Sequence, residues 1–110
     1  MPGTVAGLAL ALEKYGSGRF TLAQILAPAI ELARDGFAIA DDTADTLSDM
    51  YRRMGRWPNS AKGFSRSDGA PLQEGDRLIQ PDLAATLAEI AERGPRGFYE
   101  GPVAERLAKA

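Results

Sequence analysis

Two pairs of carboxylates are the first residues in this sequence that could carry out acid–base chemistry. Asp41 and Asp42 are adjacent, and Glu89 and Glu92 are three residues apart. Adjacent helical residues do not face each other, and aspartate is favoured at helix N-termini, so we expect Asp41 and Asp42 to cap a helix. Glu89 and Glu92 share a helix face, but it lies opposite the apolar face, and we expect both side chains to be solvated.

Nucleophilic and metal chemistry is limited by two missing residue types. The chain contains no cysteine and no histidine, so a thiolate nucleophile, a disulfide framework, a histidine triad and an ordinary zinc site are excluded within it. The hydroxyl groups of Ser17, Ser60, Ser65 and Thr86 have no histidine to activate them. The sequence therefore predicts no catalytic residue, no metal ligand and no cofactor-binding residue in this chain.

The single tryptophan has basic neighbours. Trp57 stands near Arg52, Arg53, Arg56 and Lys62, which is the composition of a stacking platform for single-stranded nucleic acid. The chain as a whole has 13 basic and 15 acidic residues, with a net charge of −2. An aromatic side chain that fills a gap between helices is the commoner role, so we expect no nucleic-acid partner.

Small residues open the chain in the segment PGTVAG, residues 2–7. Backbone N–H groups at such a helix start can cradle an anion. The segment has neither the lysine nor the spacing of a phosphate-binding loop. We therefore expect residues 2–7 to serve as the start of a helix.

Two helices are predicted in the first third of the chain. The first begins near Thr4, whose hydroxyl can cap it, and ends before residues 16–18. Thr21 and Gln24 have the spacing of a capping box, so a second helix begins there. Pro28 lies inside it, which predicts a kink near residues 24–28 or two short helices. Gly36 is expected to end the helix in the left-handed conformation. Its predicted buried face comprises Leu22, Ile25, Leu26, Ala29, Ile30 and Ala33.

Three further helices and one irregular segment follow. A third helix begins at Asp41 or Asp42 and ends at Gly55, a fourth runs from Pro81 to residues 94–95, and a last one starts at Pro102. Residues 57–80 are rich in turn signals, and Leu78 and Ile79 are expected to pair with residues near Phe64. The predicted buried faces are Ala44, Leu47, Met50, Tyr51 and Met54 in the third helix, and Leu83, Leu87, Ile90 and Ala91 in the fourth. The predicted fold is mainly α: a small bundle of about five helices, with an irregular loop or short hairpin near residues 57–80.

The composition predicts a thin hydrophobic core. Nineteen of the 110 residues are alanine, so few large apolar side chains remain to fill space. Alanine favours helices and lets them approach closely. No apolar run approaches the roughly 20 residues that span a bilayer, and we expect no membrane span. A layer of such helices would either fold compactly by itself or pack against the rest of a larger protein that supplies apolar surface.

Six short segments stand out along the chain: residues 2–7 (PGTVAG), 15–16 (YG), 26–37 (LAPAIELARDGF), 72–76 (LQEGD), 80–84 (QPDLA) and 97–101 (GFYEG). In this order they resemble the large subunit of the γ-glutamyltransferases, also called γ-glutamyltranspeptidases or glutathione hydrolases, over essentially the whole chain. Nothing in composition or periodicity by itself identifies this family. The resemblance implies that residues 1–110 form one helical segment of a larger α/β N-terminal nucleophile hydrolase fold.

The resemblance implies an enzyme made as a precursor that cleaves itself, so that a new N-terminal threonine becomes the nucleophile. In the family this threonine attacks the γ-glutamyl amide of glutathione, and the acyl group passes to water or to an amino acid. The threonine follows the segment matched here, and the arginine that binds the substrate's α-carboxylate precedes residues 2–7. We therefore transfer no family catalytic residue onto this chain, and we expect the chain to be inactive alone.

The expected partners are the remainder of the large subunit and the small subunit, and the expected substrate of the whole enzyme is glutathione or another γ-glutamyl compound. The resemblance also implies a periplasmic or extracellular location and an introduced start at Met1. We expect the isolated chain to self-associate if the apolar face that normally meets the rest of the enzyme is exposed. These residues do not distinguish a γ-glutamyltransferase from a member of the same family that acts on cephalosporin side chains or other acyl amides. The alternative is an independent helical binding or interaction module with a pocket lined by Met50, Met54, Trp57 and Phe64.

Overall fold

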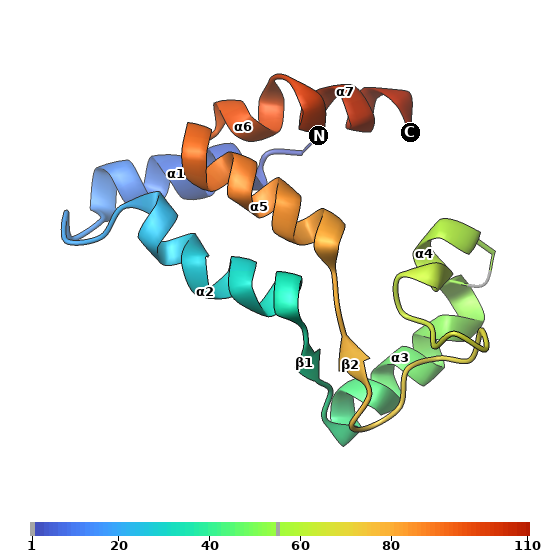
Figure 1. Ribbon diagram of the computed structural model, residues 1–110. Helices are drawn as coiled ribbons and strands as arrows, with labels where there is room; N and C mark the ends of the chain where they lie inside the picture. Colours follow the sequence, from blue (N-terminus) through green and yellow to red (C-terminus); the bar gives the residue numbers. More distant parts are fainter. Residues whose placement is uncertain (1, 55) are drawn as a thin grey trace. The chain divides into compact units, whose positions relative to one another are not determined.

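The computed structural model describes residues 2–54 and 56–110, and it is mainly helical, as predicted (Figure 1). The elements are α1 (Thr4–Tyr15), α2 (Leu22–Asp35), β1 (Phe37–Ala38), α3 (Asp41–Met54), α4 (Pro58–Lys62), β2 (Arg77–Leu78), α5 (Pro81–Arg93), α6 (Arg96–Tyr99) and α7 (Pro102–Lys109). The five predicted helices are present, and the short helices α4 and α6 were not predicted. The inferences on Met1 and on a helix end at Gly55 lie outside the described residues.

The chain divides into two compact units. The terminal unit comprises Met1–Arg34 and Pro81–Ala110, and the central unit comprises Asp35–Gln80. The terminal unit therefore contains α1, most of α2, and α5 to α7, whereas the central unit contains the two strands, α3 and α4. The grouping of residues 1–110 as one helical segment stays a prediction.

Helix α1 begins where the sequence predicts but is capped differently. Gly3 is its N-cap and offers no side-chain hydrogen bond, so the prediction that Thr4 caps the helix is wrong. The reason is position: Thr4 is already the first helical residue, whereas a capping side chain must precede the first turn. At the other end the Gly16 N–H donates to the Leu12 carbonyl over 2.9 Å.

Helix α2 confirms the predicted capping box. The Thr21 N–H donates to Gln24 Oε1 over 2.9 Å, and the Gln24 N–H donates to Thr21 Oγ1 over 3.2 Å. The helix continues through Pro28 to Asp35, so the alternative of two short helices is wrong. Gly36 follows with φ +75°, the left-handed conformation that the sequence predicts and that glycine adopts without strain.

Helices α5 and α6 approach each other at Gly97. A Cβ atom built at Gly97 would meet the backbone carbonyl of Glu89 and lie 3.0 Å from the Ile90 nitrogen. Only a residue without a side chain allows this backbone contact. Ile90 and Gly97 are both buried, so this contact forms part of the small core of the terminal unit.

The central unit has its own apolar cluster and a two-stranded antiparallel sheet. Ile39, Ala44, Leu72 and Leu78 are buried together, with Leu47 and Phe64 packed against them. Strand β1 pairs with β2, so that Phe37 lies opposite Leu78 and Ala38 opposite Arg77. The Tyr51 hydroxyl donates to the Gly69 carbonyl and ties α3 to the following loop.

The predicted pairing of Leu78 and Ile79 with residues near Phe64 is wrong. Phe64 accepts the Leu72 N–H over 3.1 Å, and Ser65 forms a bridge with Pro71. The turn at Gly69, with φ +84°, folds the chain back within a few residues. Phe64 thus pairs with a segment close to it in the chain. Strand β2 pairs instead with β1, which directly follows Gly36.

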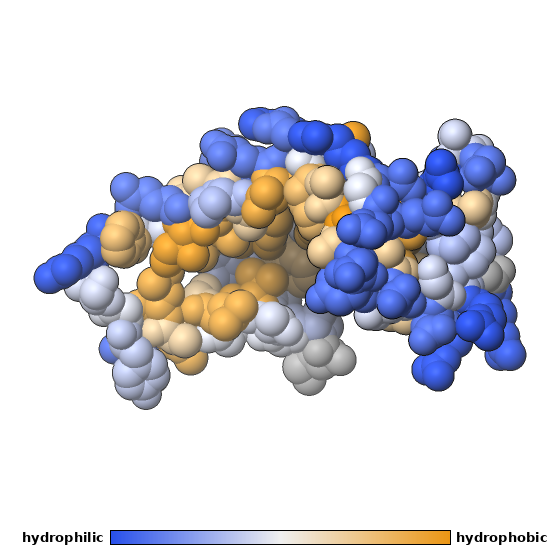
Figure 2. Space-filling model, turned by 90° about the horizontal axis from the view of Figure 1, so that it is seen from below, coloured by the Kyte–Doolittle hydropathy of each residue, from blue (hydrophilic) through white to orange (hydrophobic). Residues whose placement is uncertain are grey.

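The predicted helix faces are only partly buried. Ala33, Ala44, Ala84, Ile90 and Val103 are covered, and they are mostly small. Several predicted core residues keep large exposed areas within this chain: Ile25, Met50 and Leu83. The thin core is therefore confirmed, and Figure 2 shows apolar side chains gathered on a face of the molecule over the terminal unit.

Candidate functional site

The aspartates at the start of α3 bind its own backbone. Asp41 Oδ1 accepts the Asp42 N–H over 2.8 Å, and Asp42 Oδ1 accepts the Thr43 N–H over 2.6 Å. These amides belong to the first turn, whose N–H groups have no partner inside the helix. Asp41 and Asp42 are the first two residues of α3, so the prediction that one of them is its N-cap is wrong for the same reason as at Thr4. The prediction that both carboxylates serve the start of the helix is confirmed.

The glutamates of α5 also have local roles. Glu89 forms an ion pair with Arg93 one helical turn away, with a closest N–O distance of 3.5 Å, and both side chains are more than a third exposed. Glu92 is exposed. Exposed pairs of this kind contribute little to stability. Glu89 and Glu92 do not form a carboxylate pair directed into a cavity that the structure describes.

Three of the four hydroxyl groups considered as nucleophiles bind nearby backbone atoms. The Ser65 hydroxyl donates to the Ala61 carbonyl, the Thr86 hydroxyl donates to the Asp82 carbonyl over 2.9 Å, and Ser17 Oγ accepts the Arg19 N–H over 3.3 Å. Within residues 2–54 and 56–110, no group of three acidic residues is placed to hold a metal ion. No helix in the described ranges is long and apolar enough to cross a membrane.

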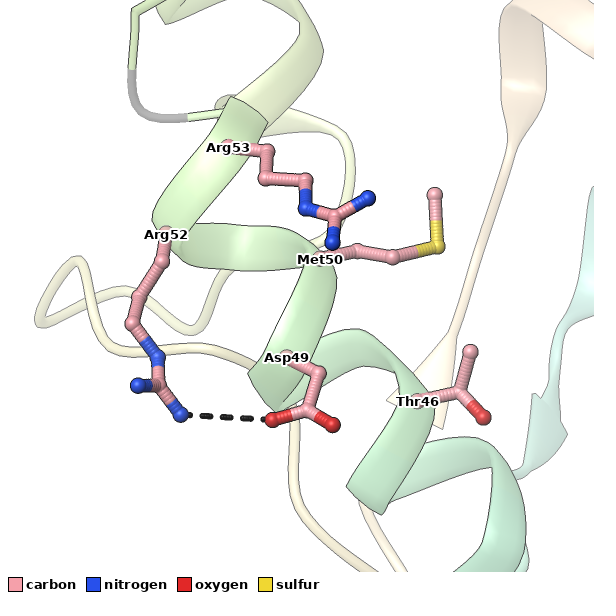
Figure 3. A pocket seen from close by; sticks show the side chains of 5 residues that line it. All are labelled: Thr46, Asp49, Met50, Arg52 and Arg53. Atoms are coloured by element: carbon pink, nitrogen blue, oxygen red, sulfur yellow. Dashed lines mark hydrogen bonds and ion pairs between the residues drawn. The ribbon is translucent and has the colours of Figure 1, made fainter.

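Within the described residues, the four side chains predicted to line a binding-module pocket lie in different surroundings. Met50 lines one open hollow with Thr46, Asp49, Arg52 and Arg53 (Figure 3). Trp57 lines another with arginines 52, 53 and 56. Phe64 instead packs against the buried cluster of the central unit. Met54 lines neither of the two hollows, so the sequence pattern did not identify a shared cavity.

The helix start at residues 2–7 is occupied by a tyrosine from the far end of the chain. The Tyr99 hydroxyl donates to the Pro2 carbonyl over 2.6 Å and accepts the Ala6 N–H over 3.1 Å. It thus supplies the cap that Gly3 lacks. The Ala6 N–H is no longer available to an anion, which agrees with the prediction that this segment starts a helix.

This hydroxyl joins the first and last of the six family-like segments. Pro2 and Ala6 belong to PGTVAG, and Tyr99 belongs to GFYEG, more than 90 residues later. Spacing along the sequence gives no signal for such a contact. The first and the last of the segments that carry the resemblance therefore meet in the terminal unit.

The comparisons with known proteins agree with this arrangement. The family model for γ-glutamyltranspeptidase matches residues 1–110. The chain belongs to the γ-glutamyltranspeptidase family. The crystal structure of γ-glutamyltranspeptidase from Helicobacter pylori superposes with a TM-score of 0.92 at 43% identity, over 99% of this chain and 31% of that one.

Curated relatives in the γ-glutamyltranspeptidase family are longer than this chain. The glutathione hydrolase proenzyme of Escherichia coli K12 is 44% identical over 108 residues, which is 98% of this chain and 18% of the relative. The proenzyme of Bacillus subtilis strain 168 is 40% identical over 107 residues, again 18% of its length. The chain thus spans about a fifth of these relatives. A family match over the whole chain favours this assignment over an independent binding module.

Proposed function

We propose that these 110 residues form a helical scaffold in the large subunit of a γ-glutamyltransferase. The whole enzyme would cleave γ-glutamyl amides, such as glutathione, and transfer the γ-glutamyl group to water or to an amino acid. The observation that carries the proposal is the superposition on the H. pylori enzyme over 99% of the chain, with a TM-score of 0.92. Such agreement at 43% identity places the same helices in the same order.

The chemistry would come from residues outside this segment. The family resemblance implies a threonine nucleophile released by self-cleavage, and the relatives named above are described as proenzymes. Asp41, Asp42 and the hydroxyls of Ser17, Ser65 and Thr86 bind nearby backbone atoms, and Glu89 pairs with Arg93. The role proposed for this chain is therefore to hold neighbouring parts of the enzyme in place, with the remainder of the large subunit and the small subunit as its partners.

Bare apolar surface on the terminal unit supports a scaffold role. Leu8 is 66% exposed and Phe20 63% exposed. An open hollow of about 550 Å³ is lined mainly by apolar residues of α1, together with Leu22 and Pro95. Covering one such leucine contributes about 1.5–3 kcal/mol, so contact with the rest of an enzyme would stabilise this unit. The same surface predicts self-association of the isolated chain.

A chimera tests the proposal. The matching segment of the E. coli glutathione hydrolase would be replaced by these 110 residues, and self-cleavage and hydrolysis of γ-glutamyl-p-nitroanilide would be measured beside the unmodified enzyme. We expect the chimera to mature and to hydrolyse the substrate, and the isolated chain to show no turnover. Turnover by the isolated chain, or a folded and cleaved chimera without activity, would contradict the proposal.

A further inference from the structure

The end of α3 and the residues after it carry a local excess of positive charge. Between Met50 and Ser67 the sequence has no acidic residue, and it contains the basic residues Arg52, Arg53, Arg56, Lys62 and Arg66. Arg66 is neutralised locally, because its Nε lies 3.3 Å from Asp76 Oδ2. The excess charge is therefore concentrated around the arginines at the end of α3.

Of Arg52, Arg53 and Arg56, only Arg52 has a carboxylate partner within the described residues. Arg52 pairs with Asp49 over 3.2 Å, but the two side chains are 83% and 82% exposed, so the pair is weak. No ion pair involves Arg53 or Arg56 in the part of the chain that the structure describes. Their guanidinium groups are open to an incoming carboxylate.

Two open hollows meet at Arg52 and Arg53. One, of about 490 Å³, contains Met50, and the other, of about 400 Å³, contains Arg56 and Trp57. Figure 3 shows the Arg53 side chain extending beside Met50, whereas Arg52 reaches toward Asp49 on the other side of α3. We call Met50, Arg52, Arg53, Arg56 and Trp57 the arginine–tryptophan surface.

The composition of this surface is that of a protein interface. Arginine, tryptophan and methionine are enriched where proteins bind each other, and tryptophan and arginine often dominate the binding energy. Trp57 is 61% exposed and Met50 is 47% exposed, so apolar area stands beside unpaired guanidinium groups. An arginine side chain can bind a carboxylate through two parallel hydrogen bonds.

We propose that the arginine–tryptophan surface docks an acidic polypeptide segment. Its carboxylates would pair with Arg53 and Arg56, and an apolar side chain would lie against Met50 or Trp57. A nucleic acid fits less well, because a chain with a net charge of −2 has no overall field that attracts a polyanion. Short-range pairing combined with apolar contact matches a peptide.

The single tryptophan provides the assay. Trp57 is the only indole in the chain, so a change in its emission reports binding at this surface. The chain would be titrated with a short α-linked peptide of glutamate and leucine, with the same peptide carrying glutamine for glutamate, and with single-stranded oligodeoxythymidine. We expect saturable binding of the acidic peptide that weakens as salt is raised, and little effect of the neutral peptide.

Paired variants separate the surface from general charge. The double substitution Arg53→Gln and Arg56→Gln removes two positive charges, and the control Lys14→Gln and Arg19→Gln removes the same charge from exposed sites of the terminal unit. Circular dichroism checks that both variants keep their helices. The first variant should bind the acidic peptide roughly two- to thirty-fold more weakly, which is the range for the loss of two exposed ion pairs. The control variant should bind the peptide as tightly as the parent chain does.

Four results would overturn the proposal. The first is no saturable change in Trp57 emission with the acidic peptide. The second is equal weakening in the control variant, which would mean that only net charge matters. The third is tighter binding of the oligodeoxythymidine than of the peptide, which would make this a phosphate-binding surface. A wild-type affinity that does not change with salt would exclude the arginine pairing even if the variant failed to fold.

Discussion

Replacing Tyr99 with phenylalanine should loosen the start of α1 without disturbing the aromatic packing. The substitution removes only the hydroxyl, which donates to Pro2 and accepts from Ala6. The ring stays beside Phe98, where the two centroids are 5.1 Å apart in an edge-to-face arrangement. The change in stability therefore measures the two hydrogen bonds.

The expected size follows from the exposure of the groups involved. A hydrogen bond contributes about 0.5–1.5 kcal/mol net, and water can partly replace a lost partner at exposed atoms. Pro2 and Ala6 are both exposed, so we expect the lower end for each bond and a total loss of about 1 kcal/mol. A loss of this size lowers the melting temperature of a domain of this length by about 4 °C.

Amide hydrogen exchange at Ala6 gives the most direct measurement. If opening of the first turn is about 1 kcal/mol easier, the Ala6 amide should exchange about five-fold faster. Tyr15→Phe is the matched control, because Tyr15 is 86% exposed and has no hydrogen-bond partner within residues 2–54 and 56–110. If Tyr99→Phe and Tyr15→Phe gave the same melting temperature and the same Ala6 exchange rate, the capping role of Tyr99 would be refuted.

Four further substitutions, one of them a control, test separate parts of the terminal unit. Gly97→Ala forces a Cβ atom against the backbone of α5 and should lower the free energy of unfolding in urea by about 1–3 kcal/mol. The control Gly7→Ala has nothing within 4 Å of the added atom and should stabilise α1 by about 0.5–1 kcal/mol. If both substitutions changed the stability alike, the close contact at Gly97 would be contradicted. Thr21→Ala removes the capping box and should cost about 1 kcal/mol, with faster exchange of the first amides of α2 as the readout. Pro28→Ala restores a helical N–H and should raise the melting temperature, since an interior proline costs about 3 kcal/mol; a lowered melting temperature would show that the proline ring makes contacts worth more than the missing bond.

Local signals in the sequence predicted the helices well. Thr21 and Gln24 form their capping box because both partners lie within one turn, and Gly36 adopts its left-handed conformation because the residue type itself permits it. Pro81 and Pro102 each lie in the first turn of the helix that they were expected to open. Such features depend on neighbours in the chain, and the sequence records those directly.

Features that depend on distant partners were missed. The cap of α1 comes from Tyr99, and the partner of β2 is β1 and not the segment near Phe64. Periodicity marks which face of a helix is apolar, but it carries no information about what covers that face. Ile25 accordingly belongs to the predicted buried face of α2 and remains exposed in this chain.

The candidate site was predictable mainly by exclusion. The absence of histidine and cysteine limited the available chemistry, and the local roles of Asp41 and Asp42 followed from their position at a helix start. Among the described residues neither Arg53 nor Arg56 has a carboxylate partner. The sequence does not reveal this, because pairing depends on which carboxylates the fold brings within reach.

The order in which the two units can form follows from which parts of the chain each unit contains. Residues 35–80 make up the central unit as one uninterrupted stretch, whereas the terminal unit needs residues from both ends of the chain. During synthesis from the N-terminus, the hydrogen bond between Pro2 and Tyr99 can form only after Tyr99 has been made. Closing the loop between these two residues costs about 4 kcal/mol of chain entropy. The central unit can therefore fold while α1 still lacks the cap that Tyr99 supplies.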